Sequence, residues 1–148
     1  MRILACAALA AIFAASSYAQ SASPKCVDVS APKVQGAFTG VLEKHTFAGP
    51  PNWDNAANGD KPLPTFILRL PKKICAQDGN QFANPTKMFD DIHVSGRGEP
   101  PPWDWLNAHV GQKVTLNGDI FAAHTIWHRA PLVLLLPKGW TPSPEKIP

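Results

Sequence analysis

The amino-acid sequence predicts a mainly β fold: a small five-stranded barrel with one short helix between the third and fourth strands. Sixteen prolines and ten glycines among 148 residues favour strands and turns over a helical bundle. Apolar residues alternate along several separate segments, whereas helical spacing occurs in a single one, residues 103–110. A chain of this length has room for one hydrophobic core, so we expect a single domain over residues 20–136.

The first residues predict a signal peptide over residues 1–19. Arg2 precedes an apolar run, and Ser17 and Ala19 place small side chains where signal peptidase requires them. The run is shorter than the ~20 residues that span a bilayer as a helix, and no later segment is long enough. We therefore expect an exported protein without a membrane span, either periplasmic or secreted.

Removal of the signal peptide leaves two cysteines, Cys26 and Cys75. In an oxidising compartment such a pair predicts a structural disulfide, which would stabilise the fold by roughly 4 kcal/mol. The alternative is two free thiols that act as ligands or nucleophiles. It is disfavoured because neither cysteine lies in a C-x-x-C or Cys-His setting.

The first two strands follow an arm, residues 20–33, that is tied down at Cys26. Residues 34–47 alternate between apolar and polar side chains, and glycines on the apolar side permit strong bending. A long polar loop, 48–64, leads to a second strand, 65–74. Its inward residues are Phe66, Leu68 and Leu70.

The third strand, 87–95, follows a turn-rich connection. The helix 103–110 comes next and ends before Gly111, a typical C-terminal cap. We expect Trp103 and Trp105 on this helix to plug the bottom of the barrel. The fourth strand, 113–121, alternates again. The fifth, 132–136, is continuously apolar, which predicts burial on both sides, and a proline-rich tail, 137–148, ends the chain.

Three strands, a short helix and two more strands are the order of the OB-fold, a small, partly open barrel. The bent first strand agrees with that fold. A small β-sandwich is the competing interpretation, and the position of the lone helix favours the OB-like barrel.

Charge and motifs argue against nucleic-acid binding and against catalysis. The formal net charge is only +3, and the basic residues form no cluster. No Ser-His-Asp or Cys-His constellation and no glycine-rich phosphate loop occurs. Asp90 and Asp91 are adjacent in a strand, so their carboxylates point to opposite faces. The sequence therefore favours a binding protein over an enzyme.

His124 and His128 are four residues apart, a spacing that would place both imidazoles on one face of a helix, as a metal site requires. We expect this segment to continue a strand instead, which would place the rings about 13 Å apart. A hairpin bend between them could bring them together, with His93 or Asp119 completing a zinc site. Polar loop histidines are the simpler interpretation. We therefore expect no cofactor and retain zinc as an alternative.

Trp53 is the strongest candidate for a binding residue, because it stands in a polar loop with little apolar company. In an OB-fold this first loop borders the usual binding face. A tryptophan there could stack on a sugar or anchor a protein partner, and the competing possibility is that it folds back over the barrel mouth. We expect Asn52, Asp60, His128 and Arg129 to join it.

Several segments resemble one protein family. They are Gly-Pro-Pro-Asn-Trp at 49–53, Phe-Ile-Leu-Arg-Leu at 66–70, Gly-Gln-Lys-Val-Thr-Leu-Asn-Gly at 111–118, and residues 125–133. Together they resemble a family of small exported bacterial domains of unknown function (DUF4431), whose cysteine positions also match. The family carries a histidine run before the last strand, of which this chain keeps only His128. The resemblance implies the fold and export but no activity.

The sequence thus predicts an exported, disulfide-tied, non-catalytic module that recognises an envelope protein or a cell-wall glycan. The alternative is a metal-dependent hydrolase that uses His124, His128 and His93. A third possibility is a purely structural piece of an envelope assembly.

Overall fold

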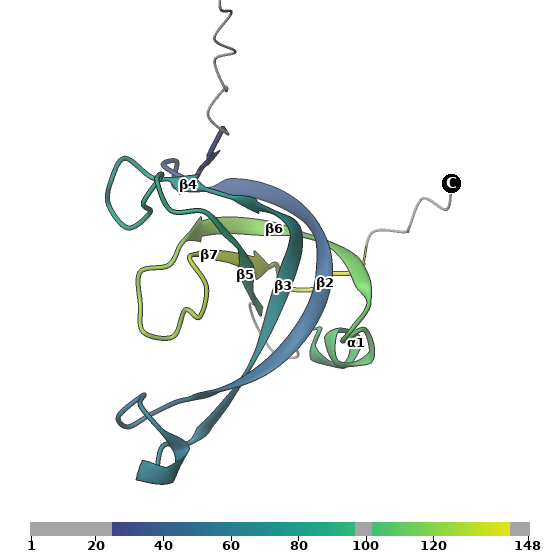
Figure 1. The fold of residues 1–148 in the computed structure, drawn as a ribbon. Coiled ribbons are helices and arrows are strands. Elements are labelled where there is room, and N and C mark those ends of the chain that lie inside the picture. The colour runs from purple at the N-terminus through teal and green to yellow at the C-terminus, as the bar shows by residue number, and fades with distance from the viewer. Residues whose placement is uncertain (1–24, 97–101, 143–148) are drawn as a thin grey trace, which may run out of the picture.

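A computed structural model describes residues 25–96 and 102–142 of the chain (Figure 1). The predicted signal peptide and the end of the predicted tail, residues 143–148, lie outside this part. The mainly β fold with one short α-helix is confirmed. The long strands are β2 (Val34–Ala48), β3 (Pro62–Ile74), β5 (Phe89–Gly96), β6 (Lys113–Ala122) and β7 (Leu132–Leu136).

The five long strands form a closed ring of pairings in the order β2-β3-β5-β7-β6. The long strand β2 curves around the barrel and pairs antiparallel with β3 on one side and β6 on the other (Figure 1). Only β5 and β7 run parallel, and α1 (Trp103–Ala108) lies between β5 and β6 in the chain. The predicted order of three strands, one helix and two strands is therefore present.

Close approach of neighbouring strands explains one of the glycines in β2. A Cβ atom at Gly40 would lie 2.4 Å from the carbonyl oxygen of Arg69 in β3. No side chain fits there unless the backbone of β3 moves away. This glycine therefore allows the tight curvature that the alternating pattern predicted.

The β3 strand begins at Pro62, earlier than the sequence predicted, so the loop before it is shorter. Proline cannot donate to a β ladder, so Pro62 and Pro64 are unusual within a strand that is paired on both sides. In the structure β3 pairs with β5 only from Phe66 onward. Residues 62–65 therefore form an edge that pairs with β2 alone, where proline is tolerated.

Alternate residues of the strands fill the barrel with a single apolar core. Leu42, Leu68 and Ile92 are fully buried at its centre, and Leu106 of α1 is buried with them. Trp105 packs against this core as predicted. In contrast, Trp103 remains 37% exposed and stacks on Phe66, with 5.6 Å between ring centroids.

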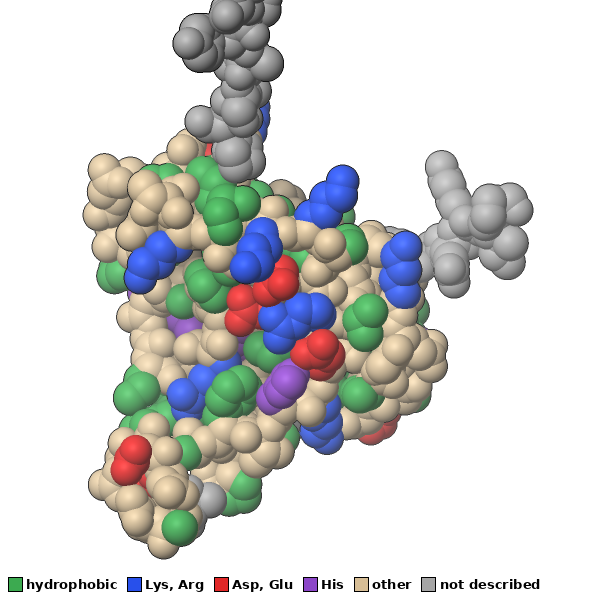
Figure 2. Space-filling model, in the orientation of Figure 1, with side chains coloured by type: hydrophobic (Ala, Val, Ile, Leu, Met, Phe, Trp, Pro, Cys, Tyr) green, Lys and Arg blue, Asp and Glu red, His purple; other side chains and the backbone are tan. Residues whose placement is uncertain are grey.

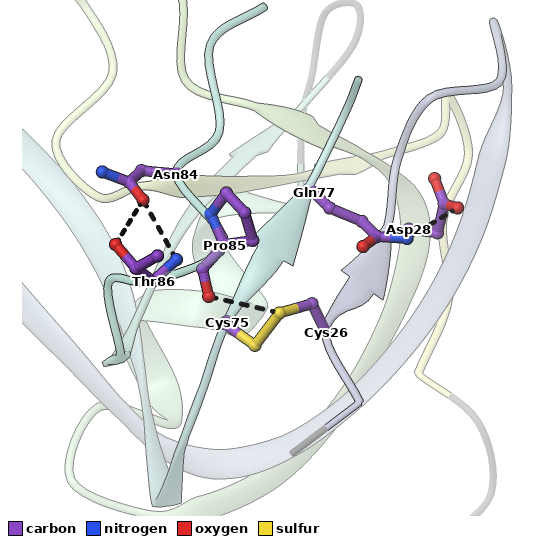
Figure 3. The surroundings of a disulfide bond; sticks show 7 residues. All are labelled: Cys26, Asp28, Cys75, Gln77, Asn84, Pro85 and Thr86. Carbon is purple, nitrogen blue, oxygen red and sulfur yellow. Dashed lines mark hydrogen bonds between the residues drawn. A yellow bond between two sulfur atoms is a disulfide. The ribbon is translucent and has the colours of Figure 1, made fainter. Parts of the chain in front are cut away.

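The N-terminal arm is held by the predicted disulfide between Cys26 and Cys75, whose Cα atoms lie 4.6 Å apart (Figure 3). Beside it, β1 (Val27–Asp28) pairs in parallel with β4 (Ala76–Gln77), two short strands that the sequence did not predict. Figure 3 also shows the Cys26 sulfur 3.5 Å from the carbonyl oxygen of Pro85. Because the oxidised sulfur carries no proton, we regard this as a packing contact. A disulfide is compatible with an extracytoplasmic location.

The first residues of the predicted tail pack against the barrel. Trp140 is only 8% exposed, and its indole N–H donates a hydrogen bond of 3.3 Å to the Asn117 side-chain oxygen. Within residues 25–96 and 102–142, no helix has the length and apolar character needed to cross a membrane.

Candidate binding surface

The β2–β3 loop, residues 49–61, is organised around the carboxylate of Asp60. This side chain is 4% exposed and accepts backbone N–H bonds from Asn52, Asp54 and Asn55 at 2.8, 2.8 and 2.9 Å. Burial alone would raise its pKa, but these three donors hold the pKa below its ordinary value. The sequence placed Asp60 among the binding residues. The structure gives it the role of fixing the loop, while the Asn52 side chain remains exposed.

The same loop holds Trp53 in a left-handed backbone conformation, with φ of 64°. Its N–H donates to the carbonyl oxygen of Gly49 at 2.9 Å. This conformation is costly for a bulky aromatic residue, so the surrounding loop must impose it. The side chain is half-buried. The prediction that Trp53 has few apolar neighbours was wrong, because its ring centroid lies 4.3 Å from that of Trp127 in an edge-to-face contact.

The second loop, residues 123–131, connects β6 to β7. The prediction that His124 to His128 continues a strand was wrong, because β6 ends at Ala122 and the chain must reverse to pair with β7. The His128 Nδ1 atom accepts backbone N–H bonds from His124 at 3.0 Å and Thr125 at 3.3 Å. These bonds close a tight bend that brings the two imidazole centroids to 4.9 Å, far less than the extended spacing.

Arg129 connects the two loops. Its Nη2 atom donates a 2.7 Å hydrogen bond to the carbonyl oxygen of Ala48, at the end of β2. The guanidinium carbon lies 5.3 Å from the ring centroid of Phe47 and 5.1 Å from that of Trp53, within cation–π range. The Arg129 Nε is buried without a hydrogen-bond partner among the described residues. The guanidinium is therefore committed to holding the β6–β7 loop against the β2–β3 hairpin.

Beneath the β6–β7 loop, a row of side chains on the outer face of the sheet is shielded from solvent. It follows the register from Ile67 in β3 through His93 in β5 to Val133 in β7. Ile67 and Val133 are 2% and 0% exposed, although neither belongs to the barrel core. The sheet is thus buried on both sides here, as the continuously apolar last strand predicted.

His93 links this row to the loop, because its Nδ1 atom accepts the backbone N–H of Arg129 at 3.2 Å. Burial first, and then the charges on His128 and Arg129, lower the pKa of His93 to about 4. The pKa of His128 is also lowered, first by burial and then by His124. His93 is therefore neutral near pH 7, with the ring proton on Nε2.

The two loops together expose a compact apolar surface. We define the tryptophan surface as Trp53, Ile126, Trp127 and Arg129. Ile126 and Trp127 are 56% and 51% exposed, although both are large hydrophobic residues. Figure 1 shows the two loops on the same side of the barrel. The sequence predicted two members of this surface, Trp53 and Arg129, but missed Trp127 and its contact.

Another face of the barrel carries mixed charge. Arg69 bridges Glu43 at 3.5 Å and Asp90 at 3.0 Å. On the face of the molecule that Figure 2 shows, basic and acidic side chains lie among one another, with neither sign gathered into a patch.

The three histidines considered for zinc do lie close together. The ring centroids of His93 and His128 are 6.1 Å apart, and those of His124 and His128 are 4.9 Å apart. Each Nδ1 atom is already engaged: His93 and His128 accept backbone N–H bonds, and His124 donates to the carbonyl oxygen of Ala122 at 3.0 Å. In the described part of the chain, no group of three or more His, Cys, Asp or Glu residues is arranged to hold a metal ion.

The family model of a domain of unknown function (DUF4431) matches residues 91–136, from β5 through β7. The resemblance to that family is thereby confirmed for this part of the chain. The matched residues include the β6–β7 loop but not the β2–β3 loop that holds Trp53. No curated protein and no solved structure matches the chain.

Proposed function

We propose that the chain is an exported, non-catalytic binding module with an OB-like barrel, and that its tryptophan surface recognises an envelope protein. The observation that carries the proposal is the contact between Trp53 and Trp127, which come from different loops and leave large apolar area exposed. In OB-folds, the loop after the first strand and the loop before the last strand border the binding face. The β2–β3 and β6–β7 loops occupy these two positions.

The residue types of the surface suit a protein partner. Tryptophan and arginine are the residues most enriched at positions that dominate protein–protein binding energy. Arg129 holds the two loops together through a backbone hydrogen bond and contacts with two aromatic rings. The entropic cost of ordering these loops on binding is therefore small.

A glycan would require an open aromatic face with polar groups around it. Trp53 does not offer one, because Arg129 lies over its ring and Trp127 contacts it. The exposed neighbour of Trp127 is Ile126, which cannot form side-chain hydrogen bonds to sugar hydroxyls. These contacts favour an apolar protein groove over a saccharide.

The test is capture from an envelope extract, with isolated cell-wall sacculi as a parallel arm, followed by calorimetric titration of any captured protein. Trp127→Ala should weaken binding about 30-fold, equivalent to roughly 2 kcal/mol for a dominant interface residue. Val110→Ala, a change at a residue 41% exposed outside the two loops, should leave binding unchanged. Capture of sacculi but not protein, or equal binding by both variants, would contradict the proposal.

A further inference from the structure

A pocket of about 410 Å³ lies between the β2–β3 hairpin, the end of β5 and helix α1. Its size falls within the range of about 300–1,000 Å³ that small-molecule sites occupy. The sequence gave no indication of it, because its lining comes from four elements that are distant along the chain.

One wall of the pocket is aromatic. Phe66 and Trp103 stack with an interplanar angle of 14° and centroids 5.6 Å apart, and Val94 lies beside them in the lining. The partial exposure of Trp103 is explained by this position, since the indole borders open space instead of the core. A flat apolar group would find matching surface here.

One charged side chain, Lys44, lies beside this wall among the described lining residues. The Lys44 ammonium lies 5.5 Å from the Phe66 centroid and donates one hydrogen bond of 2.7 Å to the side-chain oxygen of Asn107. That single bond positions the ammonium and leaves two of its N–H groups for a ligand.

His93 is also among the residues that border the pocket, but its side chain belongs to the outer row with Ile67 and Val133, on the other face of the sheet from Phe66 and Val94. No aspartate or glutamate is among the described lining residues. The described lining therefore combines one cation, Lys44, with an apolar wall.

We propose that this pocket binds a small organic anion, a carboxylate on a flat apolar body, with the carboxylate at Lys44 and the body against Trp103 and Phe66. The positive charge and the donors complement a carboxylate, and the stacked rings complement an aromatic or planar aliphatic group. The pocket lining includes no residue of the tryptophan surface, although its member His93 accepts the Arg129 N–H, so the two proposals are tested through different side chains.

The experiment titrates the isotope-labelled, disulfide-intact protein with naphthylacetate and with naphthylacetamide, observed by NMR. The two probes share one apolar body and differ in charge. We expect both to shift the indole N–H signal of Trp103, and the anion to bind about fivefold more tightly than the amide, since a charge-assisted hydrogen bond is stronger than a neutral one.

Matched variants separate this site from other surfaces. Lys44→Gln should abolish the preference for the anion, whereas Lys113→Gln, a change at an exposed lysine outside the pocket lining, should preserve it. Trp127→Ala should leave both titrations unchanged, so failure of the protein-binding proposal would not affect this result. The proposal is overturned if neither probe shifts Trp103 at millimolar concentration, if the two probes bind equally, or if the shifts map to Trp127.

Discussion

Protonation of His93 should destabilise the folded protein in mild acid. In the native state its cross-strand neighbours are the apolar Ile67 and Val133, and its Nδ1 accepts the Arg129 N–H. A proton on Nδ1 would remove that acceptor and place a charge beside Arg129 in a buried row. The unfolded chain imposes no such cost, because there the imidazole is surrounded by water.

The magnitude follows from the two pKa values. Burial, together with the charges on His128 and Arg129, lowers the pKa of His93 from 6.5 to about 4. Because the native pKa is the lower one, the unfolded state binds more protons between pH 6.5 and 4, and stability falls as the pH falls through that window. At about 1.36 kcal/mol per pKa unit, the full loss is about 3 kcal/mol, of which about 2 kcal/mol is expected by pH 5.

Urea unfolding at pH 7.5 and at pH 5 measures this loss, with His93→Gln as the variant that cannot titrate. The variant is less stable at pH 7.5, but its free energy of unfolding should change about 2 kcal/mol less between the two pH values than that of the wild type. His45→Gln, at an exposed histidine of β2, should retain the wild-type change. Equal pH dependence in the wild type and His93→Gln would refute the assignment to this residue.

Three further perturbations test the disulfide, the barrel and the loop contact. Replacing Cys26 and Cys75 together by alanine should lower the free energy of unfolding by about 4 kcal/mol, measured by urea unfolding, and added reductant should have no further effect on the variant. Gly40→Ala should lower the free energy of unfolding by about 3 kcal/mol, because the new methyl group meets the Arg69 carbonyl oxygen at 2.4 Å. Gly36→Ala should lower it by only about 1 kcal/mol, because its methyl group meets movable side-chain atoms at 2.9 Å. The reverse order of the two losses would contradict the packing argument. Arg129→Ala should cost about 2 kcal/mol through its lost hydrogen bond and aromatic contacts, and should accelerate amide hydrogen exchange in residues 123–131 while the strands remain protected.

The inward faces of the strands could be predicted from the sequence because alternation has a period of two. Phe66, Leu68 and Leu70 were all assigned to the interior and are all buried. The last strand matched the prediction at both ends because a continuous apolar run has few other interpretations. The two-residue strands β1 and β4 were missed, since segments that short carry no detectable periodicity.

The candidate surface was only partly predictable. Trp53 was found because an aromatic residue in a polar loop is conspicuous, but its contact with Trp127 joins residues 74 positions apart and leaves no local pattern. His93 alternates with the inward residues Ile92 and Val94, and it is partly buried where the β6–β7 loop contacts it. The pocket beside Trp103 was also not predicted, because an aromatic residue on the apolar arc of a helix suggested core packing.

The structure separates the residues that stabilise the barrel from those proposed to bind. The core cluster contains no residue of 49–61 or 123–131, the two loops that form the tryptophan surface. Those loops are held instead by polar contacts, namely the carboxylate of Asp60, the Nδ1 of His128 and the guanidinium of Arg129. Trp127 is half exposed and takes part in none of these polar contacts. Its removal should therefore change binding far more than stability, so a loss of affinity in Trp127→Ala can be attributed to the surface itself.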